Sequence, residues 1–122
     1  MRKFNPKATH PARAIQAWQI LIGMAKNRQT TTYQGLSVLM FGKEAAGVLA
    51  QILGHIAFYC MDNDLPPLTS IVVDKGRGTP GHGFPIEAPS LDQRREQVYA
   101  YNWYDVYPPS EEELAVSYSN HQ

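Results

Sequence analysis

Residues 30–54 read TTTYQGLSVLMFGKEAAGVLAQILG, and this stretch decides the fold. The pattern predicts a short helix that starts near Tyr33 and takes one of the three preceding threonines as its cap. The glycine at position 42 is expected to end that helix, because glycine adopts the left-handed conformation at no steric cost. A second helix is predicted over residues 43–61. Two helices joined by a tight turn form a helix-turn-helix.

A further amphipathic helix is predicted upstream, from His10 to about Lys26. The proline at position 11 is tolerated there, because the first N–H groups of a helix have no intrahelical partner. The apolar side chains of this helix recur on one face, as Ile15, Trp18, Leu21, Ile22 and Ala25. The helix pair is expected to turn inward Leu36, Leu39, Met40, Val48, Leu49, Ile52, Leu53, Ile56 and Tyr59.

The second half of the chain is typical of a small wing followed by two short helices. Residues 68–74 have the β-branched enrichment of a strand, and residues 84–86 are expected to pair with them across a glycine-rich loop. Ser90 and Ser110 each stand three residues before a Gln or Glu, which is the pattern of a capping box. The helix after Ser90 is expected to bury Leu91, Val98 and Tyr101. We therefore predict a mainly α fold with a small β hairpin, a winged helix-turn-helix.

Length and composition indicate one domain of 122 residues. We divide it into a flexible N-terminal arm (1–9), a winged-helix domain (10–107) and a short C-terminal helix with a tail (108–122). No run of apolar residues is long enough to span a membrane, so no membrane partner is expected. Cys60 stands alone, which excludes an internal disulfide and favours a cytoplasmic location. The residue pattern leads us to expect no cofactor and no metal.

The net charge of zero conceals an asymmetry along the chain. Residues 1–61 hold seven Lys or Arg and one acid, a balance of +6, whereas residues 62–122 hold four against ten acids, a balance of −6. The basic half contains the helix-turn-helix, and this favours a polyanionic partner. The alternative is that the two halves fold against each other and neutralise their charges locally.

Several local motifs follow one another in a distinctive order. They are Trp18 in the first helix, Thr32-Tyr33-Gln34-Gly35, Ala45-Ala46-Gly47-Val48-Leu49, Leu65-Pro66, Ile71-Val72-Val73-Asp74 and Asp92-Gln93-Arg94-Arg95. This order resembles the DNA-binding domain of the O6-alkylguanine-DNA alkyltransferases and the alkyltransferase-like proteins, over residues 12–104. The resemblance implies a winged helix-turn-helix that binds double-stranded DNA.

The chain departs from that family at the residues that carry its chemistry. The repair enzymes hold a Pro-Cys-His-Arg nucleophile motif just before their Val-Val strand, and the matching residues 65–70 contain no Cys, His or Arg. Alkyl transfer needs an activated thiolate, so no enzymatic activity is expected. Ala46 stands at the position of the family's DNA-inserting arginine, whereas its Thr-Tyr pair is kept as Thr32-Tyr33.

We therefore predict a noncatalytic DNA-binding protein that contacts the phosphate backbone with little base specificity. The expected backbone contacts are Thr32, Tyr33 and Lys43, flanked by Arg28, Lys75 and Arg77, with Gln51 on the second helix of the pair. Few hydrogen-bond donors stand on that helix, which argues against sequence-specific reading. Its small residues serve either close approach to DNA or close packing between helices: Ala45, Ala46, Gly47 and Ala50.

Two other classes of function stay open. A protein-interaction or adaptor subunit, or a homodimer, is favoured by the aromatic run in the acidic half, Tyr99, Tyr101, Trp103, Tyr104 and Tyr107. An enzyme is favoured only by a loop that holds Asp74, Lys75, Arg77 and His82, in a spacing that fits no catalytic motif. We expect His55 and Cys60 to be buried residues of the helix over 43–61, and not a metal ligand or a nucleophile.

Overall fold

The computed structural model describes residues 1–5, 7–73 and 91–122. Its α-helices are α1 (His10–Lys26), α2 (Tyr33–Phe41), α3 (Leu49–Asp62), α4 (Leu91–Ala100) and α5 (Glu111–Asn120). Its short strands are β1 (Thr31–Thr32) and β2 (Val72–Val73), and single 3-10 turns lie at Ala46–Val48, Leu68–Ile71 and Trp103–Asp105. The prediction of a mainly α fold is therefore confirmed.

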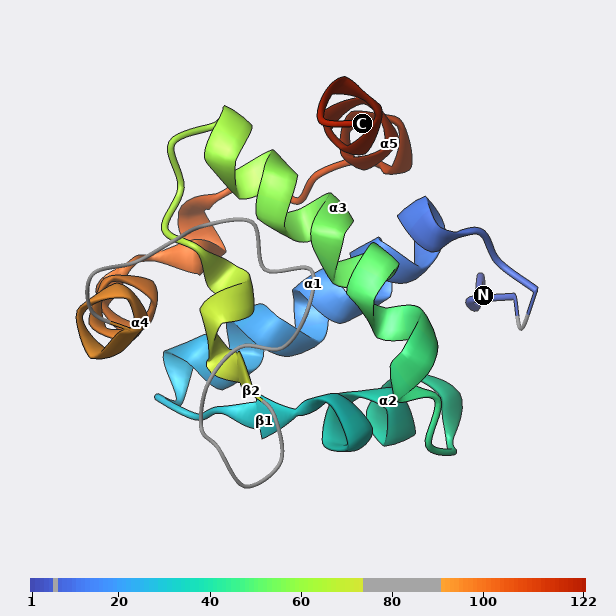
Figure 1. Ribbon diagram of the computed structural model, residues 1–122, viewed down its shortest axis with the longest axis horizontal. Coiled ribbons are helices and arrows are strands. Elements are labelled where there is room, and N and C mark those ends of the chain that lie inside the picture. The colour runs from blue at the N-terminus through green and yellow to red at the C-terminus, as the bar shows by residue number, and fades with distance from the viewer. Residues whose placement is uncertain (6, 74–90) are drawn as a thin grey trace.

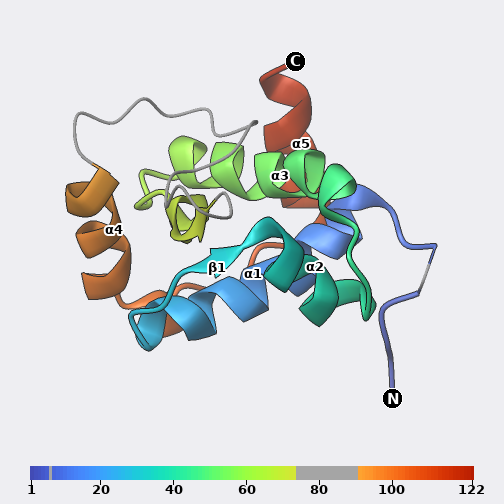
Figure 2. The same ribbon diagram turned by 60° about the horizontal axis from the view of Figure 1, so that its bottom comes forward.

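The helices are arranged around α1, which runs through the middle of the molecule (Figure 1). Helix α3 crosses α1, α5 packs against both, and α4 lies at the far end against Leu68–Ile71. Trp18 of α1 is central to the core, with its ring edge-on to Tyr59 at 5.8 Å and to Trp103 at 5.6 Å between centroids. Figure 2 shows α4 at one end of the molecule and α2 toward the other, where the α2–α3 turn reaches the surface near the N-terminal arm.

The small sheet is parallel, where the sequence predicted a hairpin. Strand β1 pairs with β2 in the register Thr31 to Val72 and Thr32 to Val73. The connection between them runs through α2 and α3, which is the kind of crossover that parallel pairing requires. Residues 68–71, predicted as the start of a strand, form a 3-10 turn instead. The predicted partner strand of the hairpin lies outside the described residues.

Both ends of α2 follow the predicted pattern. Thr32 caps the helix, because its Oγ1 accepts the backbone N–H of Gly35 at 2.9 Å. Gly42 ends it with a φ of +76°, a conformation that strains any residue with a Cβ. Local sequence chemistry therefore fixes where this helix begins and ends.

Helix α3 begins later than predicted, at Leu49 instead of Lys43. The backbone N–H of Ala45 donates to Ser37 Oγ at 3.0 Å, which holds the intervening residues in a turn against α2. A 3-10 turn over Ala46–Val48 then leads into the helix. Side-chain hydroxyls that bond to the backbone in this way compete with helix formation, and hydrophobic periodicity does not reveal them.

Most of the predicted core is confirmed, since the following residues are buried: Trp18, Leu21, Ala25, Leu36, Met40, Leu49, Ile52, Leu53, Ile56, Tyr59 and Val98. Ile15 and Ile22 are half-buried against it. Three predictions are wrong, because Leu39 is 57% exposed, Val48 46% and Tyr101 37%. Val48 precedes α3 and Tyr101 follows α4, so neither shares the buried face of its helix. On α2, Ser37 faces inward to hold the turn, and Leu39 faces solvent.

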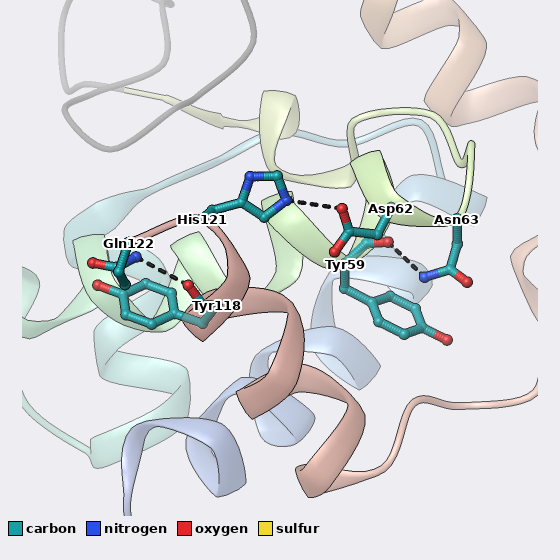
Figure 3. Close-up of polar contacts among 6 residues, drawn as sticks. All are labelled: Tyr59, Asp62, Asn63, Tyr118, His121 and Gln122. Atoms are coloured by element: carbon teal, nitrogen blue, oxygen red, sulfur yellow. Dashed lines mark hydrogen bonds and ion pairs between the residues drawn. The ribbon is translucent and has the colours of Figure 1, made fainter.

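Helix α5 shares the same core. Its start carries the predicted capping box, in which Ser110 Oγ accepts the backbone N–H of Glu113 at 3.1 Å. Leu114, one turn further on, is fully buried. Just beyond the helix, His121 Nε2 donates to Asp62 Oδ1 at 2.8 Å, where α3 ends (Figure 3). The buried leucine and this polar contact fix α5 along α3.

Candidate nucleic-acid interface

The predicted helix-turn-helix exposes only the start of its second helix. Residues 52–57 of α3 are all buried, so this helix cannot lie lengthwise against a partner. Gly47, Val48 and Gln51 are exposed at its start. A Cβ at Gly47 would meet no atom within 4 Å, so this glycine does not serve close packing between helices. The accessible surface of the pair is the α2–α3 turn and the first turn of α3.

A groove of about 810 Å³ opens beside this turn, between the N-terminal arm, the first turns of α1 and the end of α2. Four of its lining side chains are cations: Arg2, Lys3, Arg13 and Lys43. The remaining lining residues are Phe4, Gln16, Met40, Phe41, Ala45 and Val48, none of which carries a carboxylate. We call this feature the cationic groove, because its walls concentrate positive charge.

Arg13 lies in the wall of the cationic groove and is only 8% exposed. Its Nη1 donates to Gln16 Oε1 at 2.7 Å, and its Nη2 donates to the carbonyl oxygen of Asn5 at 3.1 Å. Its guanidinium carbon lies 4.7 Å from the centroid of the Phe41 ring. None of the carboxylates that the structure describes forms an ion pair with Arg13. Its contacts are therefore with neutral groups.

Four of the predicted contacts lie on or near α2, the α2–α3 turn and the start of α3. Lys43 is exposed in the α2–α3 turn, and Gln51 is exposed on the first turn of α3. Thr32 and Tyr33 are half-buried, since Thr32 caps α2 and Tyr33 packs against the core. Among these four residues, Lys43 and Gln51 are therefore the more accessible.

Arg28 lies at the opposite end of α1, a helix of 17 residues that is roughly 25 Å long. It forms an ion pair with Glu96 of α4, and its guanidinium carbon lies 5.0 Å from the centroid of the Tyr99 ring. The charge of Arg28 is therefore matched within the protein, and the fold does not bring it beside Lys43. The remaining predicted residues, Asp74, Lys75, Arg77 and His82, lie outside the described part of the chain.

Sequence reasoning missed three of the four cations of the groove: Arg2, Lys3 and Arg13. The expectation of a free arm gave no reason to place Arg2 and Lys3 beside α1. In the structure, the Asn5 carbonyl accepts its bond from Arg13, and this contact holds the arm against the helix. The signal that pointed here was the surplus of Lys and Arg in the first half of the chain.

Cys60 and His55 are buried in α3, as predicted. Burial raises the pKa of the Cys60 thiol to about 12, so this thiol stays protonated at neutral pH. Burial also lowers the pKa of His55, whose Nδ1 donates to the Gln51 carbonyl at 2.7 Å. Within the described ranges, no three His, Cys, Asp or Glu side chains come together in a way that could hold a metal ion.

Exposed aromatic and acidic side chains follow one another along residues 104–113. Tyr104 and Tyr107 are 59% and 91% exposed, and residues 111–113 are exposed glutamates. Trp103, from the same aromatic run, is buried, and its Nε1 donates to the Val98 carbonyl at 2.8 Å. The predicted aromatic run therefore contributes Trp103 to the core and leaves Tyr104 and Tyr107 accessible, a few residues before the exposed glutamates.

None of the helices that the structure describes is both long and apolar enough to cross a membrane. The resemblance to the alkyltransferase family rests on the order of motifs in the sequence. Comparison of the chain with protein-family models, with curated proteins and with solved structures found no match.

Proposed function

We propose that the protein is a noncatalytic DNA-binding protein, which contacts the phosphate backbone of double-stranded DNA with the α2–α3 turn and the cationic groove beside it. The observation that carries this proposal is the gathering of cations around an exposed turn, with no carboxylate among the described lining residues. Cations placed in this way neutralise neighbouring phosphates and release the counterions condensed on DNA. That release supplies most of the free energy of nonspecific binding.

The exposed side chains favour contact with the backbone over reading of the bases. Gln51 is the one long polar side chain on the first turn of α3, and Val48 beside it offers no side-chain hydrogen bond. Recognition of a base sequence requires several donors and acceptors aimed at base edges. The order of motifs in the sequence supports the same partner, while the absence of the family's nucleophile motif supports binding without chemistry.

Two charge reversals test the proposal, one in the α2–α3 turn beside the groove and one at the far end of α1. Lys43→Glu removes a cation from the groove, and Lys26→Glu makes the same change at the far end of the helix. We expect Lys43→Glu to weaken binding of a short labelled duplex at low salt by tenfold or more. The reversal removes one positive charge and adds one negative charge, so it changes the local charge by two units. Lys26→Glu should stay within about twofold of the unaltered protein. Fluorescence anisotropy measures both.

Two results would count against the proposal. One is equal weakening by the two reversals, which would mean that net charge matters and the groove does not. The other is an absence of binding by the unaltered protein at low salt. Duplexes of unrelated sequence provide the test of base specificity, because specific sites bind their proteins about a thousandfold or more tighter than nonspecific DNA.

A second candidate is a protein-interaction subunit. It is favoured by the exposed Tyr104 and Tyr107 and the glutamates at 111–113, which could meet the cationic groove of another copy. Such a contact joins different surfaces and is of the head-to-tail kind. Light scattering at low and high salt separates the candidates. An oligomer that dissociates with salt, in a protein that does not bind the duplex, favours this second function.

A further inference from the structure

We propose that Arg13 and Lys43 form a binding site for a single phosphate group in the cationic groove, with the buried Arg13 in its wall. The site itself rests on the contacts of Arg13 and on the charges that line the groove. The identification of its occupant as a backbone phosphate of DNA rests on the proposed function.

Arg13 is a buried cation that forms no ion pair with a described carboxylate. Its side chain is withdrawn from water, yet its described partners are a carbonyl, an amide oxygen and an aromatic ring. Burial of a cation without a counterion carries a large desolvation penalty, which natural proteins normally avoid by pairing the charge. An anion that binds in the groove would supply the counterion that Arg13 lacks among the described residues.

The protein's own contacts already orient the Arg13 guanidinium. The bonds to Gln16 and Asn5 and the Phe41 ring hold its plane in one orientation. A guanidinium has five N–H donors, so these two bonds leave others for a ligand. A planar fork of donors matches two oxygens of a phosphate, and a fork that is already held loses little freedom on binding.

The charge around Arg13 is positive. Arg2, Lys3 and Lys43 line the same groove, and none of the acids that the structure describes lines it. Glu44 is exposed next to Lys43 in the sequence and is not among the groove's lining residues. Glu111 lines a neighbouring hollow of about 630 Å³, which shares Arg2, Lys3 and Phe4 with the groove. The groove is therefore suited to a multiply charged or repeating anion.

Two measurements test the site with the full chain. The first is the melting temperature in sodium phosphate against sodium chloride at equal ionic strength. A ligand that binds only the folded protein raises the melting temperature, so phosphate should stabilise the unaltered protein more than chloride does. The second is the anisotropy of the labelled duplex described above. Three variants serve both measurements: Arg13→Met, Arg13→Lys and Lys43→Ala, with Lys26→Ala as the matched control.

Arg13→Met replaces the buried cation by an apolar chain of similar length. We expect it to melt no lower than the unaltered protein in phosphate-free buffer, since an unpaired buried charge is removed. It should lose the extra stabilisation by phosphate, and its affinity for the duplex should fall about tenfold. A purely structural Arg13 predicts the opposite, a lower melting temperature with the phosphate response kept.

Arg13→Lys keeps a cation but loses the planar fork, and it provides the answer if the methionine variant does not fold. We expect a reduced phosphate response in Arg13→Lys and in Lys43→Ala, and an unchanged one in Lys26→Ala. An unchanged phosphate response in both Arg13 variants overturns the site.

The two measurements distinguish a DNA phosphate from free phosphate as the ligand. They also test the phosphate site separately from the proposed DNA-binding function. Phosphate and duplex responses that both depend on Arg13 assign the site to the DNA backbone. A phosphate response that depends on Arg13, in a protein that does not bind the duplex, leaves the site with free phosphate or a small phosphorylated ligand, and the proposed function fails. Duplex binding that does not depend on Arg13, without a phosphate response, overturns the site alone. Stabilisation by poly-glutamate equal to that by the duplex also overturns it, in favour of an acidic peptide.

Discussion

The imidazole of His55 lies flat against the ring of Tyr118, with centroids 4.1 Å apart and planes 5° from parallel. His55 belongs to α3 and is 4% exposed, whereas Tyr118 belongs to α5. Burial lowers the pKa of His55; the bond to the Gln51 carbonyl opposes that shift, and the neighbouring His10 adds to it. A titratable ring therefore lies in the contact between the two helices.

Stability should fall as the solution is acidified through the range where free histidine titrates. The unfolded chain takes up a proton at His55 near its ordinary pKa of about 6.5, whereas the folded protein does so only at lower pH. The free energy of unfolding is thus lost as pH falls below about 6.5. His55→Phe keeps a stacked ring that does not titrate. Melting curves by circular dichroism between about pH 5 and 7 should be flatter for this variant, and parallel curves would contradict the assignment.

The contact between His121 and Asp62 should make the free energy of unfolding depend on pH in a lower range than His55 does (Figure 3). The hydrogen bond from His121 lowers the pKa of Asp62, so the folded protein holds this carboxylate ionised to lower pH than the unfolded chain does. Its stabilising effect is present above about pH 4 and is lost as pH falls through the folded pKa. Asp62→Asn should lower stability by about 0.5 kcal/mol or less at neutral pH, because the pair is partly exposed. The difference from the unaltered protein should vanish in acid.

Two opposing effects should act on a substitution of Gly54 by alanine, namely higher helix propensity and a closer contact with Tyr118. Alanine is favoured over glycine within a helix by about 1 kcal/mol, but a Cβ at position 54 would lie 3.1 Å from Cε1 of Tyr118. Gly54→Ala should therefore leave stability unchanged or reduce it. In a Tyr118→Ala background the same change should stabilise by about 1 kcal/mol. Urea unfolding of the unaltered protein, the two single variants and the double variant gives the coupling free energy between positions 54 and 118. An equal effect of Gly54→Ala in both backgrounds would exclude a close contact between these positions.

Leu114 should hold α5 in the core. Its side chain is fully buried, and Leu114→Ala should cost about 2–5 kcal/mol of unfolding free energy. Val116, two residues on, is 51% exposed, so Val116→Ala should change stability by less than about 0.5 kcal/mol. Chemical denaturation measures both. Similar losses in the two variants would mean that α5 is held by its exposed side.

The proposed contacts fix the salt dependence of DNA binding. Arg13 and Lys43 share one phosphate, and Arg2 and Lys3 each neutralise one more. These three contacts give a slope of about −2.7 for the logarithm of the binding constant against the logarithm of salt concentration. Removal of one whole contact by Lys3→Ala should reduce the steepness by about 0.9. Titrations between about 50 and 200 mM NaCl resolve such a change. A slope near zero would be incompatible with backbone contacts.

Features governed by neighbouring residues could be predicted from the sequence. The Thr32 cap, the left-handed Gly42 and the Ser110 capping box each depend on side-chain to backbone chemistry within a few residues. The burial of Trp18 and Leu49 follows from helical periodicity in the same way. Local rules therefore placed the ends and inner faces of several helices.

Features that depend on distant segments could not be predicted in this way. The pairing of Thr31 with Val72 joins residues that are separated by two helices. The inward position of Ser37, which leaves Leu39 in solvent, depends on the turn that it holds at Ala45. The cationic groove depends on the arm lying beside Arg13. In each case, hydrophobic periodicity carries no information about the partner.

The place of Leu114 in the core has a consequence for biosynthesis. The ribosome delivers α1 and α3 before it delivers α5, and the surface that α5 covers stays open in the nascent chain during that interval. A message truncated ahead of residue 111 would yield a polypeptide with an uncovered apolar strip, which is a substrate for chaperones and proteases and not a smaller working protein.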